Sequence, residues 1–311
     1  MSEALETPAD TPAAARAEMR AALARIGAER GFYEEIGSEH SALFVEAGGT
    51  LIVTFENLDH VRDNAANRMP WGYGFVDAQG WSMLGLMAHG WTWYRDAAVF
   101  DFFDRLRDAG FFDRFERVVF YGASMGGYAA CVFSAAAPGA TVIAISPQAT
   151  LSREVASWET RYHRVWRRDF TGRYGFAPEM TAAARRVHLF FDPSSQLDAM
   201  HAALFQGGNV RKFYCRHMGH RIASLWLRLG ILKPVVLDCV ENRLTPLRFY
   251  RHMRARRGNP RYEKELLRRI EARNRPRLVI RYCEAILARR RAPHFRKAMR
   301  AAQAELRRRG G

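Results

Sequence analysis

Short apolar runs alternate with amphipathic segments through most of the chain. The runs are rich in β-branched and aromatic residues, are predicted to be buried strands, and lie at 81–88, 118–121, 141–145, 187–191 and 210–215. Between them, apolar residues at helical spacing predict helices at 96–108, 125–137 and 197–205. Strands that alternate with helices predict an α/β fold with a mostly parallel sheet covered on both faces.

The first 80 residues are less regular. Residues 11–30 are rich in alanine and predict an amphipathic N-terminal helix, so that 1–39 is expected to be a helix and a linker. Strand-like runs at 42–47 and 50–55 are joined by Gly48-Gly49, which predicts a hairpin. Residues 56–80 predict a long functional loop.

Two later segments depart from the alternating pattern. Residues 152–185 have no strand signal and many Arg, Trp and Tyr residues, so we expect a cap or lid above the carboxyl edge of the sheet. From Arg221 onward the pattern is helical to the end. We therefore expect an α/β domain at 40–240 and a helical extension at 241–311.

Charge divides the chain in the same way. Residues 241–311 hold 23 Lys and Arg against 6 Asp and Glu, a net charge of +17, whereas the other 240 residues have a net charge of −1. Such an extension predicts either solvated basic helix faces or a surface for a polyanion: an acidic polymer, nucleic acid or anionic lipid. Aromatic residues are sparse there, so base stacking is not indicated.

Other classes of protein are disfavoured by what the sequence lacks. No apolar run approaches the ~20 residues of a membrane span, and 1–10 do not resemble a signal peptide. The four cysteines are scattered, as in a cytoplasmic protein with reduced thiols. Metal-binding, GxGxxG and Walker A motifs are absent, so we expect neither a metal nor a cofactor.

The strand at 118–121 runs into Gly122-Ala123-Ser124-Met125-Gly126, and a predicted helix follows at once. A serine on a tight turn between a strand and a helix is the setting of a nucleophile elbow. Gly122 and Gly126 provide room, because a Cβ at either position would crowd the neighbouring strand and helix. Ser124 is therefore the candidate nucleophile.

This motif and its setting resemble the α/β-hydrolase superfamily over about residues 40–230. The run 121–130, with Trp93-Tyr94-Arg95 upstream, is similar to a bacterial branch that includes the glycan O-acetyltransferase component of accessory secretion systems. The resemblance implies serine-dependent acyl transfer and, loosely, carbohydrate esters as substrates.

A serine nucleophile needs a base and an acid that orients the base. In α/β-hydrolases these residues follow in the order Ser, Asp or Glu, His. His220 follows the last predicted strand and is the candidate base, with His217 as its neighbour and competitor. Asp192, at the end of the strand 187–191, is favoured as the acid because Pro193 fixes its backbone. Asp198 is the alternative acid, or else a cap for the next helix.

An oxyanion hole would complete the site. The backbone N–H of Met125 directly follows the serine, at the positive end of a helix, and is the first expected donor. The second is expected from the loop after 50–55, at Asn57 or its neighbour. The sequence thus predicts a serine hydrolase of the esterase type. An O-acyltransferase to a glycan with the same triad, and a non-catalytic binding protein working through its basic helices, are the alternatives.

Overall fold

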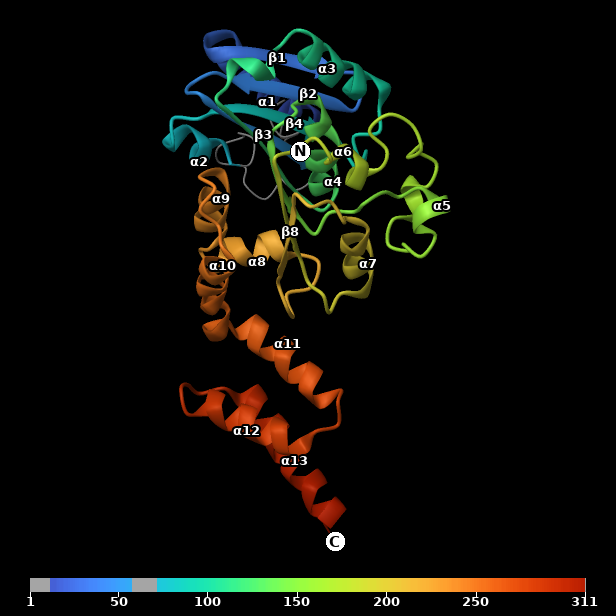
Figure 1. Cartoon of the computed structure of the whole chain (residues 1–311). Coiled ribbons are helices and arrows are strands. Elements are labelled where there is room, and N and C mark those ends of the chain that lie inside the picture. The colour runs from blue at the N-terminus through green and yellow to red at the C-terminus, as the bar shows by residue number, and fades with distance from the viewer. Residues whose placement is uncertain (1–11, 58–71, 311) are drawn as a thin grey trace, which may run out of the picture. The chain divides into compact units, whose positions relative to one another are not determined.

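The computed structural model describes residues 12–57 and 72–310. The chain divides into two compact units, Met1–Phe249 and Tyr250–Gly311. The first unit is built on an eight-stranded sheet (Figure 1). Predictions for residues 1–11 and for most of the loop at 56–80 lie outside the described residues.

The sheet has the strand order β1-β2-β4-β3-β5-β6-β7-β8. Its strands are β1 (Gly31–Ile36), β2 (His40–Val45), β3 (Thr50–Asn57), β4 (Ser82–Ala88), β5 (Arg117–Ala123), β6 (Thr141–Ile145), β7 (Arg186–Phe191) and β8 (Val210–Tyr214). β2 is antiparallel to β1 and to β4, and all other neighbours are parallel. The predicted mostly parallel sheet is confirmed.

The hairpin predicted around Gly48-Gly49 is wrong. Both strands exist, but β2 pairs with β1 and β4, whereas β3 lies between β4 and β5. The sheet also begins before residue 40, because Gly31–Ile36, expected to be linker, pairs along its whole length with β2. The local turn signal at the two glycines does not say which strands will pair.

Helices connect most of the strands, and further helices come after the last strand in the chain. They are α1 (Pro12–Arg30), α2 (Tyr73–Ala78), α3 (Ala97–Asp108), α4 (Met125–Phe133), α5 (Arg153–Ala156), α6 (Ala177–Met180), α7 (Gln196–Leu204), α8 (Ile222–Arg228), α9 (Leu232–Val240), α10 (Pro246–His252), α11 (Pro260–Glu271), α12 (Pro276–Leu287) and α13 (Pro293–Gly310). Short 3₁₀ turns occur at Phe112–Arg114, Ser134–Ala136, His163–Val165 and Met253–Gly258. Residues 152–185, the expected cap, hold no strand and are called the cap segment below.

Apolar side chains cover both faces of the sheet. On one face, Phe55 of β3 packs with Phe103 of α3 and Phe133 of α4, and the last two rings stack with centroids 4.2 Å apart. On the other face, Phe190 of β7 contacts Trp226 of α8 and Phe249. Fully burying such side chains contributes roughly 1.5–3 kcal/mol each to stability. The sheet is therefore a rigid base for the loops at its edges.

The second unit contains α11, α12 and α13, which pack around a small core of its own. Its buried residues include Leu267, Cys283 and Phe295. Glu263 is also buried, and its carboxylate pairs with Arg289 and Arg290. Residues 250–311 hold 21 Lys and Arg against 5 Asp and Glu. This unit therefore carries a net charge of +16, whereas the net charge of residues 1–249 is zero.

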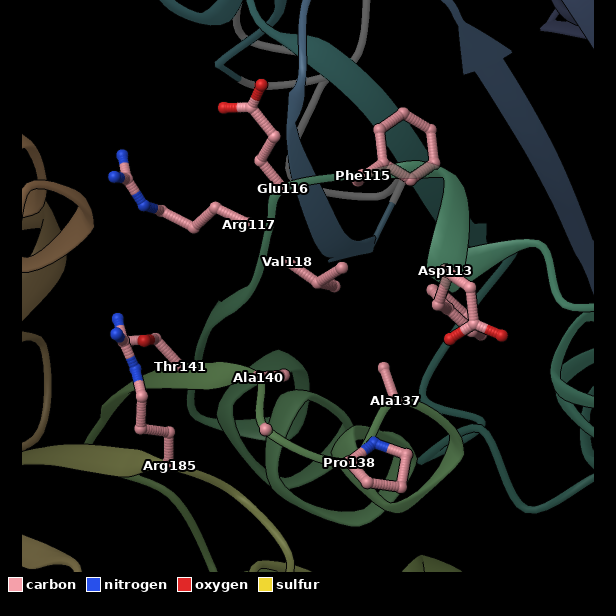
Figure 2. A pocket seen from close by; sticks show the side chains of 12 residues that line it. Asp113, Phe115, Glu116, Arg117, Val118, Ala137, Pro138, Ala140, Thr141 and Arg185 are labelled. Carbon is pink, nitrogen blue, oxygen red and sulfur yellow. The ribbon is translucent and has the colours of Figure 1, made fainter.

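A cavity of about 410 Å³ lies at the amino edge of the sheet (Figure 2). Arg117 and Thr141, the first residues of β5 and β6, line it together with Asp113, Glu116 and Arg185. In parallel α/β sheets ligands bind at the opposite edge, beyond the carboxyl ends of the strands. The cavity mixes exposed charges of both signs and is not the site predicted from the sequence.

Within residues 12–57 and 72–310, no helix is both long and apolar enough to cross a membrane. The same residues hold no group of three or more His, Cys, Asp or Glu side chains arranged to bind a metal ion. All four cysteines are buried and free of disulfides.

Candidate active site

Ser124 lies at the carboxyl edge of the sheet, between the end of β5 and the start of α4. Its backbone has φ 54° and ψ −120°, a conformation that is costly for a residue other than glycine. The turn is held by two hydrogen bonds, from Ser124 N–H to the carbonyl of Ile145 and from Tyr128 N–H to the carbonyl of Ser124. The strand–turn–helix setting expected for Ser124 is therefore present.

The two glycines that flank Ser124 are required by close backbone contacts. A Cβ on Gly122 would lie 2.0 Å from the carbonyl oxygen of Gly126, and a Cβ on Gly126 would lie 2.4 Å from the carbonyl oxygen of Phe55. Both contacts are with backbone atoms, which cannot rotate away. Helix α4 therefore approaches β5 and β3 closely enough to bring Ser124 over the sheet edge.

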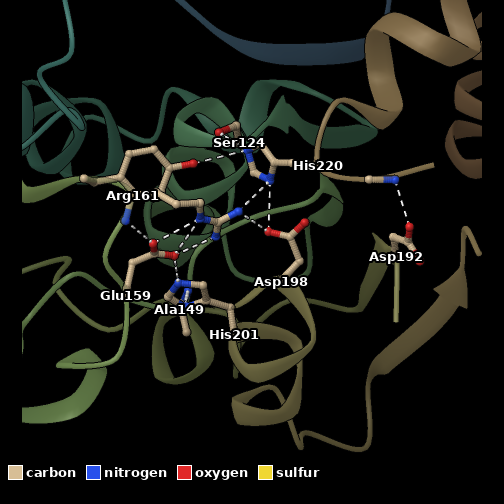
Figure 3. Close-up of polar contacts among 10 residues, drawn as sticks. Ser124, Ala149, Glu159, Arg161, Asp192, Asp198, His201 and His220 are labelled. Carbon is tan, nitrogen blue, oxygen red and sulfur yellow. Dashed lines mark hydrogen bonds and ion pairs between the residues drawn. The ribbon is translucent and has the colours of Figure 1, made fainter. Parts of the chain in front are cut away.

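Ser124 contacts a histidine that follows β8, the last strand in the sheet order. Its Oγ lies 2.8 Å from Nε2 of His220, in the loop between β8 and α8 (Figure 3). Nδ1 of the same ring lies 2.9 Å from Oδ1 of Asp198, in the first turn of α7. A carboxylate only accepts, so the ring proton lies on Nδ1 and Nε2 can accept from the serine.

Asp192, which the sequence favoured as the acid, does not contact His220. Its carboxylate accepts hydrogen bonds from the backbone N–H groups of Ser194 and Gly219, both at 2.8 Å (Figure 3). Asp192 therefore links the loop after β7 to the loop after β8. The loop continues past Pro193 into α7, which brings Asp198 to His220. The geometry thus replaces Asp192 with Asp198 as the candidate acid.

The loop that carries His220 is shaped by left-handed backbone at two positions. His217 and Gly219 both have φ 66°. His217, the competing base, has its Nδ1 3.3 Å from Oγ of Ser194, whereas His220 is the histidine that reaches Ser124. The bond from Gly219 N–H to Asp192 secures the residue next to His220.

The cap segment adds charged groups behind Asp198. Nη1 of Arg161 donates to Oδ1 of Asp198 at 2.7 Å, while the other guanidinium nitrogens bind the carboxylate of Glu159. Burial raises the pKa of the Asp198 carboxyl, but the hydrogen bond from His220 and the charge of Arg161 outweigh it, so the net pKa is lowered. Asp198 is therefore held ionised.

Glu159 has a second partner deeper in the protein. Nδ1 of His201 accepts from Ala149 N–H at 3.2 Å, which leaves Nε2 as the protonated nitrogen, 3.0 Å from Oε2 of Glu159. Burial opposes ionisation of Glu159, but the hydrogen bonds from His201 and Arg161 lower its pKa to about 2. Charges therefore alternate along the line Glu159, Arg161, Asp198.

Nη1 of Arg161 also lies 3.3 Å from Nδ1 of His220. Both atoms carry hydrogens when Nδ1 donates to Asp198, so this is a contact between two donors. The negative charge of Glu159 offsets the positive charge of the Arg161 guanidinium. The line of charges therefore leaves one net negative charge beside the imidazole.

Stability will depend on the ionised state of Glu159. Because its folded pKa is depressed from 4.5 to about 2, its contribution is present above pH 4.5 and is lost as the pH falls toward 2. Between pH 6 and pH 3 the wild type is expected to lose about 2 kcal/mol more of its unfolding free energy than Glu159→Gln. Urea denaturation at the two pH values measures this difference.

The matched control is Glu34→Gln, which removes a more exposed carboxylate paired with Arg105. Surface pairs contribute at most about 1 kcal/mol, so this variant should follow the pH dependence of the wild type. Equal pH dependence of Glu159→Gln and the wild type would contradict the assigned role of Glu159.

Tyr162, also from the cap segment, reaches the same histidine. Its hydroxyl lies 3.2 Å from Nε2 of His220, the nitrogen that contacts Ser124. Burial is the largest influence on the Tyr162 hydroxyl and raises its pKa, so the phenol stays protonated at neutral pH. Its ring packs against Trp93, with centroids 4.9 Å apart, and against the guanidinium of Arg161.

The two expected oxyanion donors lie at the same edge of the sheet. Met125 is the first residue of α4, where backbone N–H groups have no acceptor within the helix. Asn57 is the last residue of β3, the strand that pairs with β5. Tyr94 holds this strand end by donating to the carbonyl of Glu56 at 2.7 Å. The residue after Asn57 lies outside the described residues.

The sequence predicted a cap at 152–185 but did not indicate which of its residues would lie near Ser124 and His220. Glu159, Arg161 and Tyr162 lie within four positions of one another, in a stretch expected above the carboxyl edge. The available indication was a carboxylate and a guanidinium two residues apart in a segment without strand signal. His201 gave no signal, because it lies on the inner face of a short helix.

No protein-family model matches this chain, and no curated protein matches it in sequence. Among solved structures it is similar to an esterase from Pyrococcus furiosus, with 14% identity over 65% of this chain and 87% of that one and a TM-score of 0.41. It is similar to an esterase from Pyrobaculum calidifontis, with 11% identity over 78% and 96% and a TM-score of 0.46. A capsule O-acetyltransferase of Neisseria meningitidis serogroup A matches with 11% identity over 63% and 92% and a TM-score of 0.41. By the order and direction of its strands, the chain has an α/β-hydrolase-like fold.

Proposed function

We propose that this chain is a serine-dependent acyl-transfer enzyme of the esterase type. The observation that supports this is the line of contacts from Ser124 through both nitrogens of His220 to Asp198, at 2.8 and 2.9 Å. Such distances are those of a nucleophile, its base and the group that orients the base. Ser124 is the proposed nucleophile, His220 the base and Asp198 the acid.

In the proposed reaction Ser124 Oγ attacks the carbonyl carbon of an ester and His220 Nε2 takes its proton. The tetrahedral oxyanion binds Met125 N–H and a second donor at Asn57 or its neighbour. The imidazolium then gives the proton to the alkoxy oxygen, and the carbon–oxygen bond breaks to leave an acyl-enzyme. Asp198 stabilises the imidazolium throughout.

The acyl-enzyme is resolved either by water or by the hydroxyl of an acceptor. Esters of carbohydrates are the proposed substrate class, and transfer to a glycan hydroxyl is the close alternative to hydrolysis. The two reactions differ in whether the bound acceptor excludes water. The test is hydrolysis of p-nitrophenyl acetate and of a per-acetylated sugar by the purified chain, with Ser124→Ala as the reference. Ester cleavage that persists in Ser124→Ala would contradict the proposal.

A second proposed function concerns the second unit. Arg277 and Arg281 of α12, and Arg296 and Arg300 of α13, are exposed and spaced by four residues, which puts each pair on one helix face. None of the four forms an ion pair within the part of the chain that the structure describes. We propose that these two helix faces, here together called the α12–α13 face, bind a polyanion by counterion release. A non-catalytic binding protein would act through it alone.

The α12–α13 face predicts salt-dependent binding to a DNA duplex used as a generic polyanion. Replacing its four arginines with glutamine should reduce the slope of log K against log salt by about 3 to 4, because each arginine neutralises about one phosphate. The control removes four arginines that are already paired with carboxylates in the first unit: Arg105, Arg107, Arg114 and Arg173. Equal slopes for the two quadruple variants would contradict the proposal.

A further inference from the structure

We propose that Tyr162 is a further catalytic residue, which donates a hydrogen bond to the alkoxy oxygen that leaves or enters during acyl transfer. This inference rests on the proposed function, because it assigns Tyr162 a role in the same reaction. Its basis is the position of one atom, the Tyr162 hydroxyl oxygen, 3.2 Å from Nε2 of His220.

Nε2 has one lone pair, yet two hydroxyl groups lie within reach of it. Ser124 Oγ is at 2.8 Å and the Tyr162 hydroxyl at 3.2 Å. With Nδ1 protonated toward Asp198, Nε2 accepts one strong hydrogen bond, and the shorter contact belongs to the serine. The Tyr162 hydroxyl therefore lies beside the reacting nitrogen, where it also interacts with Ser124. Once Ser124 Oγ bonds to the acyl carbon, the Tyr162 proton is free to turn to another acceptor.

The direction of proton transfer identifies that acceptor. Once His220 has taken the proton of Ser124, Nε2 is a donor and can no longer accept from Tyr162. The oxygen that Nε2–H must reach is the alkoxy oxygen of the ester, which lies within hydrogen-bond distance of Nε2 when the proton is returned. The Tyr162 hydroxyl is next to the same position and donates to that oxygen as negative charge develops on it.

The protein holds the phenol in this position and in this protonation state. Trp93 packs on one side of its ring and the guanidinium of Arg161 lies over it, with Cζ 5.2 Å from the centroid. Arg161 is in turn fixed by Glu159 and Asp198. Burial raises the pKa of Tyr162, so at neutral pH it donates a hydrogen bond and keeps its proton.

The chemical step balances with Tyr162 unchanged. The bond between Ser124 Oγ and the acyl carbon is formed, the bond between that carbon and the alkoxy oxygen breaks, and the proton on Nε2 moves to the alkoxy oxygen. Tyr162 lowers the energy of the charge on that oxygen during cleavage. In the second half-reaction it contacts the oxygen of the incoming water or glycan hydroxyl in the same way.

The assignment predicts dependence on the leaving group. Nitrophenolate leaves without assistance, whereas an alkoxide needs a proton and a hydrogen-bond donor. In Tyr162→Phe, kcat/KM for an alkyl acetate is expected to fall by about a hundredfold, while kcat/KM for p-nitrophenyl acetate falls by a much smaller factor. Purely structural damage would reduce both by the same factor.

Tyr128→Phe is the matched control. The Tyr128 hydroxyl binds the cap segment, donating to the carbonyl of Tyr174 at 2.9 Å, but none of its hydrogen bonds is to Ser124, His220 or Asp198. This variant should keep the wild-type ratio of the two kcat/KM values, whatever its thermal stability.

An equal loss on both esters in Tyr162→Phe, with Ser124→Ala inactive, would overturn the role of Tyr162 and leave the proposed function intact. Activity in Ser124→Ala would instead overturn the proposed function itself.

Discussion

Replacing Ser124 with alanine is expected to lower kcat for ester hydrolysis by at least about a thousandfold. The reason is that no acyl-enzyme can form, so only binding and the oxyanion donors remain. Alanine loses one hydroxyl and keeps the backbone, and the turn is held by backbone hydrogen bonds that the change leaves in place. Steady-state kinetics with p-nitrophenyl acetate and thermal denaturation measure the two effects separately.

Ser194→Ala provides the matched control for that variant. Ser194 also lies at the carboxyl edge of the sheet and also contacts a histidine, with Oγ 3.3 Å from Nδ1 of His217. Its loss should leave kcat close to the wild-type value. A comparable loss of activity in both variants would mean that the serine–histidine contact at Ser124 has no special role.

The second large effect is expected at Asp198. In Asp198→Asn, the side chain no longer favours the imidazole tautomer with the proton on Nδ1, and the imidazolium loses its counter-charge. We expect kcat to fall by about 10³ to 10⁴. The pH profile and kcat for p-nitrophenyl acetate measure this loss.

Asp192→Asn is the natural comparison, because the sequence alone favoured that residue. Its carboxylate is fully buried and accepts two backbone hydrogen bonds, one on each oxygen. Asparagine has one oxygen and an NH₂ group that cannot accept, so one of these bonds is lost. We expect a loss of about 1–3 kcal/mol in unfolding free energy, with a much smaller loss of kcat than in Asp198→Asn. The opposite ranking of the two kcat values would restore Asp192 as the acid.

Most of the sheet could be predicted because its strands are buried on both faces. The runs at β5, β6 and β7 are almost continuously apolar, and such runs are recognisable without tertiary information. The pairing of β2 and β3 could not be predicted in the same way. The local sequence between them indicates a turn. In the folded chain, however, both strands pair with β4, which begins 25 residues after β3 ends.

The candidate site shows the same division between local and long-range information. Ser124 is recognisable because its strand, turn and helix are contiguous, and His220 because it follows the last strand. The choice between Asp192 and Asp198 depends on how the chain turns after Pro193, which no local pattern specifies. Glu159, Arg161 and Tyr162 belong to the short irregular stretch between α5 and the 3₁₀ turn at His163–Val165, so only the folded chain reveals what they contact.

Labelling with a fluorophosphonate tests the central claim most directly, since the probe reacts with a serine activated by a histidine. Intact mass and peptide mapping of the wild type should show one adduct, on Ser124, and His220→Ala should label far more slowly. Ser124→Ala should carry no adduct. Equal labelling of the wild type and Ser124→Ala would contradict the account.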